Sequence, residues 1–248
     1  MAFYDLSKEA RAALVQQMED TIGKALRSGR LAPLEAYAAD EDTYIRKSAY
    51  QALGRLYADR PQQALEAIAR LLEAADPKVR QTAVNAAGEI GRGNFEVVSA
   101  VMDKGLLDEH HIVRNAVIGS VKKMGEKNPV PVLAWAKGYL RHPDKEIRRE
   151  ICHGIELRGR THPQDILPLL ESLQHDKTAR VRNTLVHVLG QIAYKKGCLE
   201  TVVAALKTWE NQALVQDALV EIIDVHGRYS NFAVKTQAQA TEYITKSF

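Results

Sequence analysis

The sequence predicts an all-α protein, folded as a right-handed α-solenoid of about six helical repeats. An aliphatic residue followed by Arg recurs at a spacing of 34 residues: Ile45-Arg46, Val79-Arg80, Val113-Arg114, Ile147-Arg148 and Val181-Arg182. A sixth copy, Val215-Gln216, keeps only the aliphatic residue. In every copy, apolar residues four and eight positions later extend the aliphatic residue into one stripe of a helix. Such a unit cannot bury its own apolar face, but stacked units can.

The ends of the chain depart from this register in the way that end caps should. Residues 7–28 have an amphipathic helical pattern, with Ser7 as the N-cap and Gly29 at the end. A short helix is expected at 33–39, so residues 1–44 form an N-terminal cap. Five repeats then cover 45–214, and the polar last repeat, 215–248, caps the C-terminal end. No linker rich in Gly, Pro or Ser interrupts the chain, so one domain over 1–248 is predicted.

Proline and glycine each recur at one equivalent position of several repeats. Proline begins the second helix of three repeats, where its missing N–H costs nothing: Pro61, Pro129 and Pro163. Glycine occupies one equivalent position in three opening helices, which predicts that the helices approach closely there: Gly54, Gly88 and Gly190.

The repeated arginines have a structural interpretation. An aspartate precedes each of them by four or six residues: Asp42, Asp76, Asp108, Asp144 and Asp176. This arrangement resembles HEAT repeats, in which a turn Asp and the Arg at the next helix start form a ladder of pairs. Arg46, Arg80, Arg114, Arg148 and Arg182 are therefore poor candidates for ligand contacts.

Positive charge is concentrated in one block of a nearly neutral chain. The whole sequence has a formal net charge of +3, but residues 111–196 carry 16 Lys and Arg against 8 Asp and Glu. Six of the eight histidines lie in the same block. This asymmetry predicts a surface that faces a polyanion, most commonly nucleic acid, although a charged helix face can also be simply solvated.

Cysteine content and hydropathy favour a cytoplasmic location. The two cysteines, Cys152 and Cys198, form no CxxC pair and are expected to remain thiols in a reducing compartment. The N-terminus does not have the pattern of a signal peptide, and no apolar run is long enough to cross a bilayer. No membrane partner is therefore expected.

The sequence contains no motif that assigns a catalytic residue, a cofactor or a metal. A Gly-rich phosphate loop, GxSxG, HExxH and paired Cys or His at zinc spacing are all absent from it. His153 and His187 stand one repeat apart and could approach each other, as a metal or acid–base pair. Two such histidines are more often polar side chains that line a groove, and that is the role predicted for them.

Cations at the inner positions of the basic block are the candidate ligand contacts. A curved row of cationic side chains follows a phosphate backbone. The residues predicted to contact DNA phosphates, with two histidines at the groove floor, are Lys123, Arg149, Arg158, Arg160, Lys195, Lys196, His153 and His187.

Residues 133–209 resemble the HEAT-like alkylpurine DNA glycosylases of the AlkC and AlkD types. The matching elements are Leu133-Ala134-Trp135, His142-Pro143-Asp144, Ile147-Arg148-Arg149, Leu167-Pro168-Leu169-Leu170-Glu171, Asp176, Val181-Arg182, Leu189 with Ile192, and Trp209. The resemblance implies a basic concave groove that holds duplex DNA, and cleavage of the N-glycosidic bond of an alkylated base with help from a carboxylate.

The resemblance also implies where the chemistry departs from that family. Arg149 matches the family's Arg, but His153 stands at the position of its catalytic Glu, and its second acidic position falls at about Gln191. Glu150 and Glu156 are nearby, yet on an ideal helix they project about 60° or more away from position 153.

The prediction is a DNA-binding HEAT-repeat protein with little or no glycosylase activity. Two alternatives stay open. One is a protein–protein interaction scaffold, and the other is an active glycosylase that uses a displaced acid.

Overall fold

The computed structural model describes residues 3–248, and the described residues form helices and connecting loops without a strand. Residues 1–2, where the predicted N-terminal cap begins, lie outside the described residues. The chain forms two compact units, Met1–Asn128 and Pro129–Phe248. The division into one domain with end caps stays a prediction.

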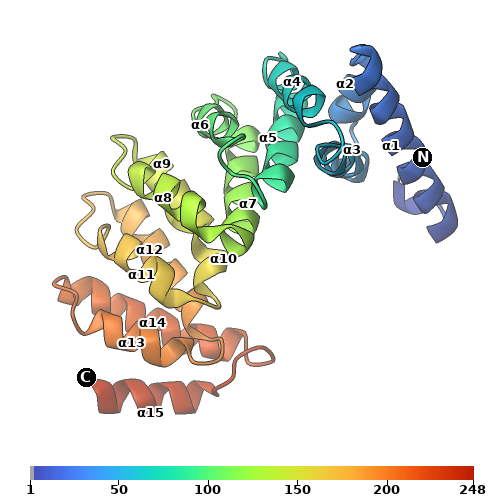
Figure 1. Cartoon of the computed structure of the whole chain (residues 1–248). Helices are drawn as coiled ribbons and strands as arrows, with labels where there is room; N and C mark the ends of the chain where they lie inside the picture. The colour runs from blue at the N-terminus through green and yellow to red at the C-terminus, as the bar shows by residue number, and fades with distance from the viewer. Residues whose placement is uncertain (1–2) are drawn as a thin grey trace. The chain divides into compact units, whose positions relative to one another are not determined.

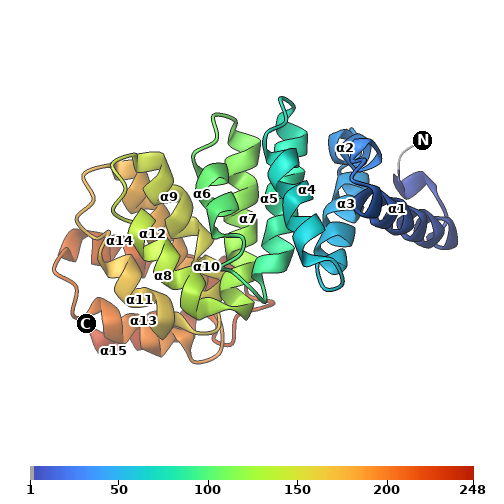
Figure 2. The same ribbon diagram turned by 45° about the horizontal axis from the view of Figure 1, so that its top comes forward.

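The first unit contains η1 and α1 to α7 (blue to green in Figure 1). Their bounds are η1 Phe3–Asp5, α1 Lys8–Ser28, α2 Ala32–Ala39, α3 Thr43–Leu56, α4 Pro61–Leu72, α5 Pro77–Gly91, α6 Ser99–Leu106 and α7 His111–Lys127. Helices α1, α3, α5 and α7 pack successively side by side, and α2, α4 and α6 pack against them as a second layer (Figure 2).

The second unit contains α8 to α15. Their bounds are α8 Pro129–Tyr139, α9 Lys145–Gly154, α10 Glu156–Gly159, α11 Pro163–Glu171, α12 Ala179–Ala193, α13 Cys198–Leu206, α14 Gln212–Arg228 and α15 Gln237–Ser247. Here α9, α12 and α14 form the first layer, and α11, α13 and α15 form the second. The predicted all-α helical-repeat fold is confirmed.

The core of each unit is built from the predicted stripes. All the apolar residues four and eight positions after the aliphatic start are buried, except Ile223, which is half-buried. The predicted helix boundaries are also confirmed. Ser7 accepts a hydrogen bond from the Ala10 N–H, and Gly29 ends α1 with φ 68°. Helices α4, α8 and α11 begin at Pro61, Pro129 and Pro163.

The repeated arginines tie each opening helix to the turn before it. In all five, Nη1 donates to the backbone carbonyl six residues earlier: Arg46 to Asp40 (2.5 Å), Arg80 to Ala74 (2.9 Å), Arg114 to Asp108 (2.7 Å), Arg148 to His142 (2.7 Å) and Arg182 to Asp176 (2.5 Å). Arg80 and Arg148 also form ion pairs with an Asp in the following turn.

The preceding aspartates divide into two kinds. Asp42, Asp76 and Asp144 are N-caps, each accepting a hydrogen bond from the backbone N–H two residues later. Asp108 and Asp176 are the acids that pair with an arginine of the repeat before. An Asp that forms a ladder pair therefore stands six residues before the next repeated Arg and binds the repeated Arg before it. An Asp that stands four residues before the next repeated Arg is used as an N-cap instead.

Cys152 and Cys198 are both buried free thiols, as predicted. Burial raises the pKa of each thiol. Among the described residues, no helix combines the length and apolar character that crossing a membrane requires.

Candidate functional site

A pocket of about 290 Å³ lies in the second unit, where α9 packs against α12. Its lining residues come from one face of each helix, at spacings of three, four and seven: Arg149, His153, Arg180, Asn183, Thr184 and His187. All six side chains can donate hydrogen bonds, and none of the six is a carboxylate. The pocket is therefore suited to an anion.

Glu146 holds both arginines at the rim of this pocket. Arg149 Nε lies 2.9 Å from Glu146 Oε2, and Arg180 Nη1 lies 3.1 Å from Glu146 Oε1. Arg149 Nη2 is also 3.4 Å from Oε1 of the buried Glu150. The Arg180 side chain is 66% exposed, so it can exchange Glu146 for an anionic ligand at little cost.

A buried polar chain leads away from His153. Its Nε2 lies 3.0 Å from Glu156 Oε2, and Glu156 Oε1 accepts hydrogen bonds from Arg160 Nε (3.0 Å) and Nη2 (2.5 Å). Arg160 Nη2 also donates to Gln191 Oε1 at 2.9 Å. The Glu156 side chain is only 2% exposed, so this carboxylate is almost entirely shielded from water, whereas His153 and Arg160 are 36% and 29% exposed.

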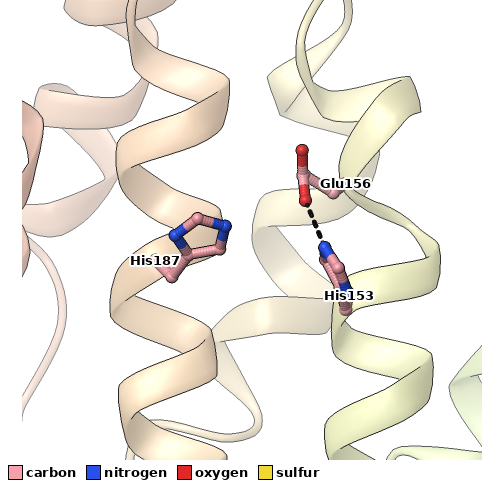
Figure 3. A group of neighbouring side chains, drawn as sticks. All are labelled: His153, Glu156 and His187. Atoms are coloured by element: carbon pink, nitrogen blue, oxygen red, sulfur yellow. Dashed lines mark ion pairs between the residues drawn. The ribbon is translucent and has the colours of Figure 1, made fainter. Parts of the chain in front are cut away.

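The expectation that Glu156 turns away from His153 was wrong. Residues three apart are neighbours on a helix and lie within reach of an ion pair. Helix α9 ends at Gly154 and a short helix, α10, begins at Glu156. Across this junction the Glu156 carboxylate lies beside the His153 ring (Figure 3).

His187 faces His153 across the two helices. Their ring centroids are 6.0 Å apart, with an interplanar angle of 71°. His187 Nδ1 lies 3.7 Å from Glu221 Oε1 on α14. The coordinating atoms of His153, Glu156 and His187 all lie within 4.8 Å of one another.

Gln191, which stands at the second acidic position of the resembled family, is buried and 2% exposed. Its Oε1 accepts from Arg160, whereas its Nε2 has no hydrogen-bond partner among the described residues. An amide here supplies no negative charge.

The structure brings only some of the predicted contact residues to this pocket. Arg149, His153 and His187 line it, while Arg158 is held by Asp165 of α11, with Nε and Nη2 at 2.8 and 2.7 Å from Oδ2. Lys123 belongs to the first unit, where its Nζ lies 3.3 Å from Glu89 Oε1.

Of the two predicted lysines that follow α12, Lys195 lies near aromatic side chains. Lys195 Nζ is 5.1 Å from the centroid of the Tyr194 ring and 5.9 Å from that of Phe232. Lys196 is exposed.

Sequence reasoning missed four residues of the site: Arg180, Asn183, Thr184 and Glu156. The first three had a signal, because residues seven, four and three positions before His187 share its face of a helix. Glu156 had one as well, because residues three positions apart are neighbours on a helix.

Comparison with known proteins identifies the fold of this chain. No protein-family model matches the sequence, and no curated protein sequence matches it. Among solved structures, AlkD2 from Streptococcus mutans matches with a TM-score of 0.56 at 15% identity, over 81% of this chain and 97% of that chain.

A second match is a structure of Crescerin, a protein that uses a TOG domain array to regulate microtubules in the primary cilium. It has a TM-score of 0.51 at 20% identity, over 76% of this chain and 87% of that chain. At these identities the likeness concerns the fold alone. The chain has a HEAT-like helical-repeat fold, which confirms at the level of fold the resemblance found in residues 133–209.

Proposed function

We propose that this protein binds duplex DNA by its phosphates, at the pocket between α9 and α12. The observation that carries the proposal is the composition of the pocket, in which two arginines, two histidines, Asn183 and Thr184 converge without a carboxylate. Arginine forks and neutral donors at a helix surface are the groups that position a DNA backbone. The family resemblance of residues 133–209 implies the same ligand.

Two further cations extend this surface in the proposal. Lys195 and Lys196 follow α12, and Lys196 is exposed. Arg158 and Arg160 contribute no phosphate contact in this proposal, because Asp165 and Glu156 neutralise them within the unit.

Little or no glycosylase activity is expected. His153 stands where the resembled family has its catalytic carboxylate, and an imidazole does not stabilise positive charge on a sugar. Glu156 is the nearest acid, but its side chain is 2% exposed and its two oxygens are engaged by Arg160 and His153. A base-release assay on methylated DNA checks this expectation.

The experiment for DNA binding is a salt titration with a fluorescent duplex. Each phosphate contact contributes about 0.9 to the slope of log K against log salt concentration, so Arg149→Gln/Arg180→Gln should flatten the slope by nearly two units. Arg180→Gln alone should flatten it by about one unit, and the substitution leaves the packing intact because the Arg180 side chain is 66% exposed.

A matched control exists in the first unit. Arg55→Gln/Arg92→Gln removes the same charge from a pocket that Glu89 also lines, so the slope should remain close to that of the wild type. Equal flattening in both double variants would mean that the pocket has no special role. An absence of binding at about 50 mM salt would overturn the DNA proposal.

Protein binding is the second candidate, and one observation favours it. The loop between α14 and α15 exposes two apolar side chains that stand two positions apart in the sequence, with Phe232 at 66% and Val234 at 62% exposure. Exposed apolar groups of this kind mark interaction surfaces. Failure of DNA binding in the titration, with folding intact, would favour this candidate.

A further inference from the structure

Two imidazoles and one carboxylate converge at a single point of the second unit (Figure 3). They come from three elements: His153 from α9, Glu156 from α10 and His187 from α12. Their coordinating atoms all lie within 4.8 Å of one another. We propose that these three residues bind a zinc ion.

The donor set is one that zinc uses. Two imidazole nitrogens and one carboxylate oxygen are found at zinc sites with three protein ligands, where a water or substrate takes the fourth position. Bonds of about 2.0–2.1 Å in a tetrahedron place neighbouring ligand atoms about 3.3 Å apart.

The ligand atoms already approach that geometry. His153 Nε2 and Glu156 Oε2 are 3.0 Å apart, and no separation in the group exceeds 4.8 Å. A movement of the His187 ring by about 1.5 Å would shorten the longest separation between ligand atoms to the distance expected around zinc. Because the His187 side chain is 45% exposed, a small rotation meets little resistance from packing.

Outer contacts hold the ligands in the orientation that zinc requires. Arg160 and Gln191 form a hydrogen-bonded chain behind Glu156 Oε1, which leaves Oε2 directed to the site. The nitrogen of His187 that faces Glu221 is Nδ1, and Figure 3 shows the other ring nitrogen turned toward His153 and Glu156. Ligands of bound metals are commonly oriented by such carboxylate and hydrogen-bond partners.

The charge around the site does not oppose a cation. Four arginines lie nearby, and each is paired with a carboxylate. The pairs are Arg149 with Glu146 and Glu150, Arg160 with Glu156, Arg180 with Glu146, and Arg228 with Glu221, which also faces His187. The zinc ion would therefore enter a region of nearly balanced charge.

The fourth coordination position would open into the pocket, because His153 and His187 both line it. A water or an anion bound there would lie near Arg149 and Arg180, so the site suits an anionic oxygen ligand. Zinc binding itself does not depend on the DNA proposal, because it can be measured with no DNA present.

The experiment uses the full chain after metal removal with a chelator. Competition with a chromophoric chelator should give about one zinc ion per chain, and Co²⁺ in its place should show the visible absorption of a tetrahedral centre. His153→Ala and His187→Ala should each weaken zinc binding by at least about 100-fold, since loss of an outer partner alone costs about 10–100-fold.

His175→Ala is the matched control. This exposed imidazole also faces a carboxylate, with Nε2 3.3 Å from Glu210 Oε2, but among residues 3–248 no third ligand belongs to that pair. Zinc binding should be unchanged in this variant. Binding should also weaken at acid pH in the wild type, because protons compete for the imidazole nitrogens.

Two results would overturn the proposal. One is the absence of stoichiometric zinc binding by the wild type, and the other is equal binding by the wild type, His153→Ala and His187→Ala. Thermal unfolding of each variant without metal shows that the fold is intact. DNA titrations with and without chelator separate this result from the DNA proposal, since either can fail while the other holds.

Discussion

Arg148 and Asp176 form a two-hydrogen-bond ion pair that connects successive repeats of the second unit. Arg148 Nε lies 2.6 Å from Asp176 Oδ2, and Nη2 lies 3.1 Å from Oδ1. Both side chains are largely buried, at 15% and 6% exposure. Arg80 and Asp108 repeat the arrangement in the first unit, with both distances within 0.1 Å of these.

Asp176→Ala should destabilise the second unit by about 3 kcal/mol, since it leaves a buried guanidinium without its counter-charge. Urea denaturation near neutral pH measures the loss. Asp217→Ala is the control, because it removes the same charge from an exposed position of α14. Equal losses in the two variants would contradict a specific role for the pair.

The same pair should make stability depend on pH. Burial by itself would raise the pKa of Asp176, but hydrogen bonds from Arg148 and the Thr178 N–H outweigh burial, so the pKa lies below its ordinary value. A carboxyl with a lowered pKa stabilises the fold above the pKa of the unfolded chain, about 3.9, and that contribution is lost as pH falls through the folded pKa. The difference in stability between wild type and Asp176→Ala should shrink below about pH 4.

Gly88→Ala should destabilise the first unit by about 1–3 kcal/mol. A Cβ at position 88 would lie 2.3 Å from Ser120 Oγ and 2.6 Å from Ser120 Cβ, so α5 and α7 would have to separate. Thermal or urea unfolding measures the effect. The control is Gly119→Ala in α7, where an added Cβ meets nothing within 4 Å, and there alanine should stabilise the helix by up to about 1 kcal/mol.

The repeat period predicted the fold and one relationship within the site. A 34-residue spacing puts residues at equivalent places of neighbouring repeats, and the structure does bring His153 and His187 to within 6.0 Å between ring centroids. Local chemistry also predicted helix boundaries, since Pro61, Pro129 and Pro163 suit only the first turn.

The remainder of the site could not be predicted from periodicity. The burial of the Glu156 carboxylate beside His153 depends on tertiary packing, which the repeat period does not give. The count of Lys and Arg in the basic block assumes that every cationic side chain is free to contact a ligand. In the structure, Arg158 and Arg160 are held by acids four to seven residues away in the sequence, and only side-chain geometry reveals those pairs.

Arg158→Gln should leave the salt dependence of DNA binding unchanged. The Arg158 side chain is 16% exposed and binds Asp165 through two nitrogens, so it is not free to take a phosphate. The same titration that tests Arg180→Gln measures this. A slope flattened by about one unit would mean that Arg158 exchanges Asp165 for DNA, and the DNA surface would then extend toward α11.

Glu156→Gln should destabilise the second unit by about 2–3 kcal/mol, because the substitution leaves Arg160 without its negative partner at a site that is mostly closed to water. Urea denaturation measures the change. The double variant Glu156→Leu/Arg160→Leu removes both charges and should be more stable than the single variant, since apolar residues often replace a buried ion pair at no net cost. If the single variant matched the wild type, Glu156 would not be the anchor of Arg160. If the double variant were the less stable of the two, the contacts of Arg160 with Gln191, at 2.9 Å, and over the Tyr194 ring, at 6.0 Å, would be the ones that hold α10 against α12.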